Sequence, residues 1–167
     1  LDKGDRVLDL CCGSGCVGLT IAKKTGADVT LADISAEALK VAGRNAKKLK
    51  VKAHFVRTDM FDGLKGVFDM IVCNPPYVKT EEIDRLDVNV REHEPRVALD
   101  GGADGLDFYR RIIDGAAAHL KDGGELLMEL GMGEAEGVKA YADGKLEFSE
   151  FIKDYDGIDR IVVFKKR

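Results

Sequence analysis

The chain has 167 residues, of which 45% are hydrophobic and 34% are charged, and its formal net charge is −4 at pH 7. This length suits one domain with a sizeable core, and the negative charge disfavours a general attraction to nucleic acid or to an anionic membrane surface. Because no apolar run approaches the ~20 residues that cross a bilayer, we expect no membrane-spanning segment.

Strand and helix patterns alternate along the first half of the chain. Apolar runs typical of strands lie at 6–11, 28–33, 52–57 and 68–73, and helical spacing is found at 15–24 and 36–49. Ser35 stands where the second helix needs an N-cap, and Glu37 falls in its first turn. This alternation predicts a parallel sheet with helices on both faces and with ligands bound at the carboxyl ends of its strands.

The second half begins with a polar stretch at 78–104, which we expect to be an irregular but ordered cover over the ligand site. The elements expected after it are a long helix at 105–120, a fifth apolar strand at 124–130, a shorter helix around 133–142, and strands at 146–155 and 160–166. The last two strands are joined by the short link DGID, which forces an antiparallel pair. The predicted fold is a doubly wound, Rossmann-like α/β sheet of about seven strands, mostly parallel, with an antiparallel C-terminal hairpin.

The four cysteines, Cys11, Cys12, Cys16 and Cys73, lie in or beside apolar runs. Buried thiols in a reducing cytoplasm explain this placement better than disulfides or a metal site. The adjacent Cys11 and Cys12 would point to opposite faces of a strand, which suits a zinc cage poorly. We therefore expect a cytoplasmic protein without a bound metal.

The first predicted strand runs into a glycine-rich turn within DLCCGSGCVG, residues 9–18. Gly13 and Gly15 permit a tight turn and a close approach to a ligand, and the next helix offers its N-terminal N–H groups. With Gly18 they also match the dinucleotide pattern G-x-G-x-x-G, and Asp33 follows about 20 residues later, where a ribose-binding acid is expected. A plain strand-to-helix turn is the structural alternative.

Two acids help to distinguish the candidate cofactors. Asp9, inside the first strand, needs a cationic or N–H partner, and the methionyl ammonium of S-adenosylmethionine and the loop amides can supply one. Asp59, in the run TDMF, can accept a hydrogen bond from the adenine amino group while Met60 or Phe61 packs on the ring, although an exposed turn residue is also a sound interpretation. A nicotinamide cofactor has no such need for acids, because its pyrophosphate would face the glycine loop.

The sequence NPPY, residues 74–77, follows the fourth predicted strand. Pro75 and Pro76 fix φ and lack N–H donors, so carbonyl groups here stay free to accept hydrogen bonds from a ligand. The Asn74 side chain and the Pro75 carbonyl offer two acceptors to a planar NH₂ group, and Tyr77 offers a ring for stacking. Such pairing aims the nitrogen lone pair at an electrophilic methyl group. The structural alternative is a loop stop made by two prolines and capped by Asn.

In this order and at these spacings, VLDLCCGSG, LADIS, TDMF and NPPYV resemble the class I S-adenosylmethionine-dependent methyltransferases that modify planar amino groups. NPPY alone is shared by N6-adenine and protein glutamine-N5 methyltransferases. The later runs EHEPRVALDGGADGLDFYR, ELG and DYDGIDRIVV resemble bacterial HemK/PrmC-type enzymes, and the resemblance covers essentially the whole chain. It implies transfer of a methyl group to the amide nitrogen N5 of the glutamine in the Gly-Gly-Gln motif of peptide chain release factors, with S-adenosylhomocysteine as product.

The resemblance also implies roles for individual residues. From the residues themselves and from the resemblance together, those expected to bind the cofactor are Asp9, Cys11, Cys12, Gly13, Ser14, Gly15, Asp33, Ile34, Asp59, Met60 and Asn74. Those expected to hold the glutamine amide as catalytic residues are Asn74, Pro75, Pro76 and Tyr77. Cys11 departs from the family pattern because many members have glycine there, and the backbone at Cys11 is therefore expected to avoid positive φ.

The resemblance further implies that residues 1–167 are the catalytic domain of a longer protein, whose N-terminal helical domain, absent here, contacts the release factor. Four alternatives stay open: glutamine methylation of ribosomal protein L3, N6-adenine methylation of nucleic acid, a nicotinamide-dependent oxidoreductase, and a module that binds cofactor without turnover. The negative charge and the lack of a basic stretch interleaved with aromatic residues disfavour direct binding to nucleic acid.

Overall fold

The computed structural model describes the backbone of residues 1–167 and every side chain except that of residue 93. Its strands form one sheet in the order β3-β2-β1-β4-β5-β7-β6. The strands are β1 (Arg6–Leu10), β2 (Asp28–Asp33), β3 (His54–Arg57), β4 (Phe68–Cys73), β5 (Leu120–Glu129), β6 (Glu147–Lys153) and β7 (Asp159–Lys165). β1 to β5 pair in parallel, whereas β7 is antiparallel to both β5 and β6. The predicted seven-stranded α/β fold with an antiparallel C-terminal hairpin is confirmed.

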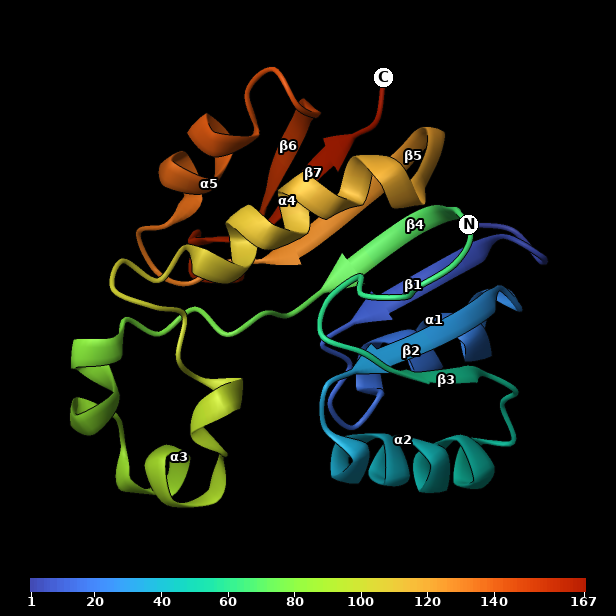
Figure 1. Ribbon diagram of the computed structural model, residues 1–167, viewed down its shortest axis with the longest axis horizontal. Helices are drawn as coiled ribbons and strands as arrows, with labels where there is room; N and C mark the ends of the chain where they lie inside the picture. Colours follow the sequence, from blue (N-terminus) through green and yellow to red (C-terminus); the bar gives the residue numbers. More distant parts are fainter.

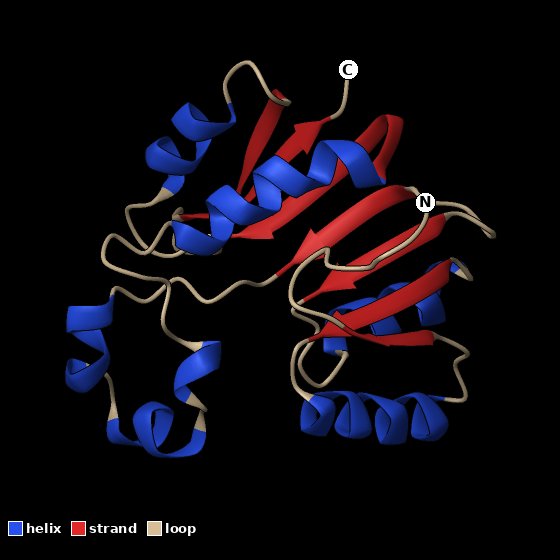
Figure 2. Cartoon of the chain, in the orientation of Figure 1, coloured by secondary structure: helices blue, strands red, loops and turns tan.

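Helices cover both faces of this sheet (Figures 1 and 2). The longer ones are α1 (Cys16–Thr25), α2 (Ala36–Leu49), α4 (Asp107–His119) and α5 (Ala135–Ala142). Val7 and Leu31 belong to the core that includes α1 and α2, whereas Leu8 and Ile71 belong to the core that includes α4 and α5. Since successive strand residues point to opposite faces, Val7 and Leu8 of one strand enter different cores. The apolar runs of the sequence therefore serve both layers at once.

Two boundaries around α4 differ from the expectation. The helix begins at Asp107, because the Asp104 carboxylate accepts the Leu106 N–H at 3.1 Å and makes a turn there. β5 begins at Leu120 and not at residue 124, because Leu120 already pairs with Phe68 before the register shifts. The helix and the strand therefore follow one another without a separating loop.

The stretch at 78–104, here called the cover segment, was expected to be irregular, but it contains regular structure. It contains η1 (Thr80–Arg85), α3 (Val88–His93) and η2 (Arg96–Ala98), three short helices that stand apart from the sheet (Figures 1 and 2). The Asp87 carboxylate accepts the Asn89 N–H at 2.8 Å and thereby caps α3. Helices of one or two turns show too few repeats for their spacing to be read from sequence, which is why this expectation was wrong.

The two ends of the cover segment are joined beside NPPY. The Val78 N–H donates to the Leu99 carbonyl at 2.9 Å, and the Gly101 N–H donates to the Val78 carbonyl at 2.8 Å. A Cβ atom at Gly101 would lie 2.7 Å from the Tyr77 Cα, so this approach requires glycine. The segment thus leaves the NPPY motif and returns to it.

In the described part of the chain, no helix is both long and apolar enough to cross a membrane. Nor do the described His, Cys, Asp and Glu side chains form a group of three or more that could hold a metal ion.

Candidate functional site

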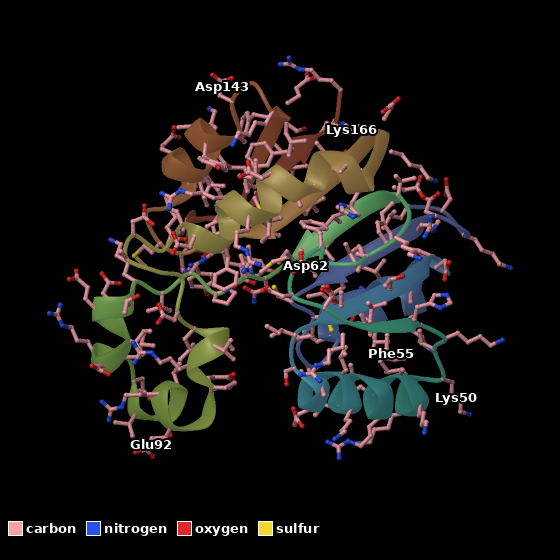
Figure 3. All side chains as sticks on the ribbon, in the orientation of Figure 1. Lys50, Phe55, Asp62, Glu92, Asp143 and Lys166 are labelled. Carbon is pink, nitrogen blue, oxygen red and sulfur yellow. The ribbon has the colours of Figure 1, made fainter. Side chains whose placement is uncertain are left out.

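A cavity of about 480 Å³ opens at the carboxyl ends of β1, β2 and β4. β1 and β4 are neighbours in the sheet, whereas the chain passes through β2 and β3 between them. Such a reversal of strand order leaves a crevice outside the strand ends. The cover segment closes the far side of the cavity with Pro95 and Val97, while Glu92 extends from its outer side (Figure 3).

The structure brings most of the predicted site residues to this cavity. Those that line it are Cys11, Gly13, Ser14, Asp33, Ile34, Asp59, Met60, Asn74 and Pro76. The predicted residues that do not contribute to its wall are Asp9, Cys12, Gly15, Pro75 and Tyr77. The second group supports the first, because its members adjoin the lining residues in sequence or bond to the elements that carry them.

The glycine-rich turn after β1, residues 11–15, is here called the glycine loop. Its backbone is left-handed at three positions. The φ angles are 56° at Cys11, 53° at Gly13 and 76° at Gly15, so the expectation that Cys11 avoids positive φ is wrong. A side chain in this region costs about 1–2 kcal/mol. The Cys12 N–H donates to the Ala32 carbonyl at 3.0 Å, and this bond to the end of β2 helps to keep Cys11 in its unfavourable conformation.

Asp33, at the end of β2, organises the elements around it. Its Oδ2 accepts the Gly13 N–H and its Oδ1 accepts the Ser35 N–H, each at 2.8 Å. The Ser35 side chain in turn accepts the Ala38 N–H at 3.1 Å, as expected for the N-cap of α2. Each carboxylate oxygen of Asp33 has a further lone pair available to a ligand in the cavity.

Asp9 is buried beneath the glycine loop, with 3% of its surface exposed. Its Oδ2 accepts the Gly18 N–H at 2.8 Å, and a Cβ atom at Gly18 would lie 2.8 Å from the same oxygen. Burial raises the pKa of Asp9 to about 7, with a smaller contribution from the negative charge of Asp33. Gly18 therefore serves close packing against Asp9, and Asp9 ties β1 to the first turn of α1.

The TDMF loop, residues 58–61, follows β3 and forms another wall. The Thr58 hydroxyl donates to the Asp62 carbonyl at 2.7 Å, and this hydrogen bond closes the loop. Figure 3 labels Asp62, which lies near the middle of the view. Met60 is buried with φ of 51°, and the Asp59 Oδ1 accepts from Arg111 Nη2 at 2.8 Å. Arg111 is on α4, fifty-two residues further along the chain.

The NPPY motif presents its first residue to the cavity. Asn74 is exposed and lines the wall, and the buried Pro76 lines it as well, whereas the buried Pro75 does not. The Tyr77 hydroxyl lies 3.4 Å from Glu129 Oε1, and burial together with the Glu129 charge raises the pKa of Tyr77. A Cβ atom at Gly131 would lie 2.9 Å from the Tyr77 ring, so this glycine lets the ring pack on the end of β5.

Sequence reasoning did not identify several residues of the cavity wall. They come from the start of α2, from the cover segment and from α4, and the most polar of them are Glu37, Glu94 and Arg111. The position of 78–104 after NPPY suggested a cover, and Ser35 with Glu37 marked the start of α2. Nothing in the local pattern around Arg111 distinguishes it from an ordinary charged residue of a helix surface.

Residues 1–91 match a family model described as Methyltransferase small domain. The chain belongs to this family. It is 41% identical over 169 residues to the release factor glutamine methyltransferase of Thermodesulfovibrio yellowstonii, with 99% of this chain and 61% of the relative covered. It is 37% identical over 174 residues to the ribosomal protein uL3 glutamine methyltransferase of Francisella tularensis subsp. tularensis, with 99% of this chain and 55% of the relative covered. The chain therefore spans less than two thirds of the length of these relatives.

Solved structures share the fold. TrmN from Thermus thermophilus has a TM-score of 0.75 and 21% identity, with 99% of this chain and 45% of that chain covered. The T. thermophilus 16S rRNA N2 G1207 methyltransferase RsmC, solved in complex with AdoMet and guanosine, has a TM-score of 0.67 and 20% identity, with 99% and 38% covered. At these identities the likeness establishes the α/β methyltransferase fold.

Proposed function

We propose that residues 1–167 are the catalytic domain of an S-adenosylmethionine-dependent protein glutamine-N5 methyltransferase that acts on peptide chain release factors. The observation that carries this proposal is that Asn74 of NPPY lines the same cavity as Gly13 and Asp33. An amide held by Asn74 would therefore lie beside a cofactor held by the glycine loop. The activity named for the relative from T. yellowstonii supports the same substrate class.

The cavity fits S-adenosylmethionine in size and in chemistry. Its volume of about 480 Å³ is within the usual range for a site that takes a molecule of this size. Asp33 can accept from the ribose hydroxyls and Asp59 from the adenine amino group. Apart from Gly13 and its two neighbours in the chain, no atom of the described residues lies within 4 Å of a Cβ position at Gly13, which leaves room for a ligand against the backbone. Two carboxylates would repel a pyrophosphate, so a nicotinamide cofactor fits less well.

S-adenosylmethionine supplies an electrophilic methyl group when bound. In the proposed mechanism, the Asn74 side-chain oxygen and the Pro75 carbonyl oxygen accept the two amide hydrogens of the substrate glutamine. This orients the amide nitrogen, and most of the contribution to catalysis is placement. The nitrogen becomes acidic only after alkylation, so the reaction does not depend on a strong general base. The Tyr77 hydroxyl links the motif to Glu129 at the end of β5. Stacking of the Tyr77 ring on the amide stays a prediction.

The direct test is mass spectrometry of a release factor incubated with the chain and isotope-labelled S-adenosylmethionine. We expect one labelled methyl group on the glutamine of the Gly-Gly-Gln peptide and none when that glutamine is replaced by asparagine. Label on no protein, although the chain binds the cofactor, would contradict the proposal.

Ribosomal protein uL3 is a second candidate substrate, because the relative from F. tularensis is named for it and is 37% identical to this chain. The same incubation is repeated with purified uL3 at the same concentration as the release factor. The initial rates of methylation of the two proteins are then compared. We expect the release factor to be the faster substrate. Both substrates belong to translation, and we place the activity in the cytoplasm.

We further propose that the surface that captures an intact release factor lies partly outside residues 1–167. Protein–protein recognition typically buries ~800 Å² on each partner, well beyond what a single glutamine offers. We expect the chain to bind cofactor normally but to methylate an intact release factor with a low kcat/KM that results from weak capture. Fusion to an N-terminal helical domain of the HemK/PrmC type should raise kcat/KM. If the chain alone matches such a fusion, the recognition surface lies within it.

Asp33→Ala should weaken binding of S-adenosylhomocysteine by about 1.5–3 kcal/mol, because hydrogen bonds to a charged acceptor are lost. The ribose hydroxyls lose their acceptor. The Gly13 N–H also loses its 2.8 Å hydrogen bond to Asp33 Oδ2, which holds the glycine loop in place. Calorimetric titration measures the affinity, and circular dichroism verifies the fold. Asp28→Ala, on the same strand but outside the cavity wall, is the matched control. Unchanged binding by a folded Asp33→Ala variant would show that the ribose is held elsewhere.

A further inference from the structure

The TDMF loop rests on one face of α4. Arg111, Gly115 and His119 are spaced four residues apart and so lie on the same side of this helix. The His119 ring stacks on Phe61 with 4.7 Å between centroids, and a Cβ atom at Gly115 would lie 2.3 Å from the Phe61 ring. The third residue, Arg111, pairs with Asp59. The loop is therefore docked on α4 by packing at one end and by an ion pair at the other.

The ion pair occupies only one oxygen of the Asp59 carboxylate. Arg111 Nη2 lies 2.8 Å from Oδ1, and the two side chains are 45% and 46% exposed. Ion pairs this exposed contribute little to stability, typically about 0–1 kcal/mol, so the main consequence here is geometric. In the part of the chain that the structure describes, no donor pairs with Asp59 Oδ2.

Arg111 is itself held in place at the cavity. Its guanidinium lies 5.7 Å from the centre of the Phe108 ring, one turn earlier on α4, and a contact between a cation and an aromatic face is favourable. Phe108, Arg111 and Asp59 all line the cavity. A packed helix thus extends a fixed cation to the carboxylate of a neighbouring loop.

We propose that Arg111 is a positioning residue for recognition of the adenine 6-amino group, because it orients Asp59 so that Oδ2 remains as the acceptor. The inference rests on the proposed function, which places adenine at this loop. An amino group donates to a carboxylate oxygen, whereas an oxo group at the same ring position presents an acceptor and is repelled. Arg111 therefore contributes to selectivity for an adenosyl over an inosyl cofactor, although it need not touch the base.

The test compares two ligands that differ at this edge of the ring, where an oxo group replaces the amino group and the adjacent N1 gains a hydrogen. Calorimetry on the chain measures the affinity for S-adenosylhomocysteine and for S-inosylhomocysteine, in which an oxo group replaces the amino group. We expect the unmodified chain to prefer the adenosyl ligand by about 10-fold or more, the value of one well-placed hydrogen bond to a charged acceptor. Arg111→Ala should lower adenosyl affinity about 5-fold or more and change inosyl affinity little, so that the ratio falls. Arg111→Lys, which keeps the charge, should restore part of the ratio.

Arg110→Ala is the matched control, because Arg110 is the adjacent residue of α4, pairs with Asp104 and Asp107, and does not line the cavity. It should leave both affinities unchanged. A purely structural role of Arg111 would weaken both ligands equally, and an unchanged ratio in Arg111→Ala would therefore overturn the inference while leaving the proposed function intact. If the unmodified chain binds neither ligand, the proposed function is wrong and the inference is wrong with it.

Discussion

Replacing Asn74 by alanine is expected to lower kcat for glutamine methylation by about 100-fold or more while leaving the fold intact. Asn74 is exposed at the cavity, and within the described residues its side chain makes no hydrogen bond, so its removal leaves no internal partner unsatisfied. What disappears is one of two acceptors that orient the amide. The rate therefore falls through misplacement of the nitrogen and not through lost proton transfer.

Single-turnover rates and S-adenosylhomocysteine titrations separate this effect from a loss of cofactor. Asn89→Ala is the control, because Asn89 belongs to the cover segment but not to the cavity wall. Asn74→Asp is the subtler variant, since it keeps an acceptor and adds a negative charge beside the sulfonium. We expect it to bind S-adenosylmethionine at least as tightly as the unmodified chain and yet to react slowly. Near-normal turnover by Asn74→Ala would contradict the proposed mechanism.

The contribution of Asp9 to stability is expected to decrease as the pH rises from about 4 to about 7. The folded protein holds the Asp9 pKa at about 7, raised from 3.8, mainly because the carboxyl group is buried. Between pH 3.8 and about pH 7, the Asp9 carboxyl group is ionised in the unfolded chain but still protonated in the folded chain. The stabilisation is therefore complete below the pKa of the unfolded state and is lost as the pH rises to the pKa of the folded state. The full difference is on the order of 4 kcal/mol, at 1.36 kcal/mol for each pKa unit.

Asp9→Asn isolates this effect from the other acids. Its amide oxygen can still accept the Gly18 N–H, but no charge is buried at high pH. Urea unfolding measures the free energy of unfolding of both proteins at pH 5 and at pH 8. From pH 5 to pH 8, this free energy should rise by about 3 kcal/mol in the variant relative to the unmodified chain. Asp143→Asn, which removes an exposed carboxylate, controls for the change in net charge. An equal difference at both pH values would show that Asp9 does not titrate as described. If Asp9 also serves the methionyl ammonium, the more stable variant should bind S-adenosylmethionine less tightly.

The sequence alone was sufficient to predict the sheet and most of the side chains that meet at its strand ends. Alternating apolar runs with caps such as Ser35 are local signals, because each depends on neighbours within a few residues. The glycine turn, Asp33 and Asn74 each follow directly on an apolar strand. Parallel strands place their carboxyl ends along one edge, and so these side chains had to meet there once the strands were recognised.

Only the tertiary structure decided what lies opposite these residues. Arg111 reaches Asp59 across fifty-two positions, and Asp9 finds its donor at Gly18 through the packing of α1 on the sheet. The positive φ of Cys11 depends in the same way on a hydrogen bond between Cys12 and Ala32 that outweighs the local preference of the residue. Each of these contacts joins segments that are separate in the sequence. Such partners cannot be predicted from local periodicity, which depends only on residues within a few positions of one another. The motifs therefore indicated the reaction, whereas the packing of α1, α4 and the cover segment determined the walls of the site.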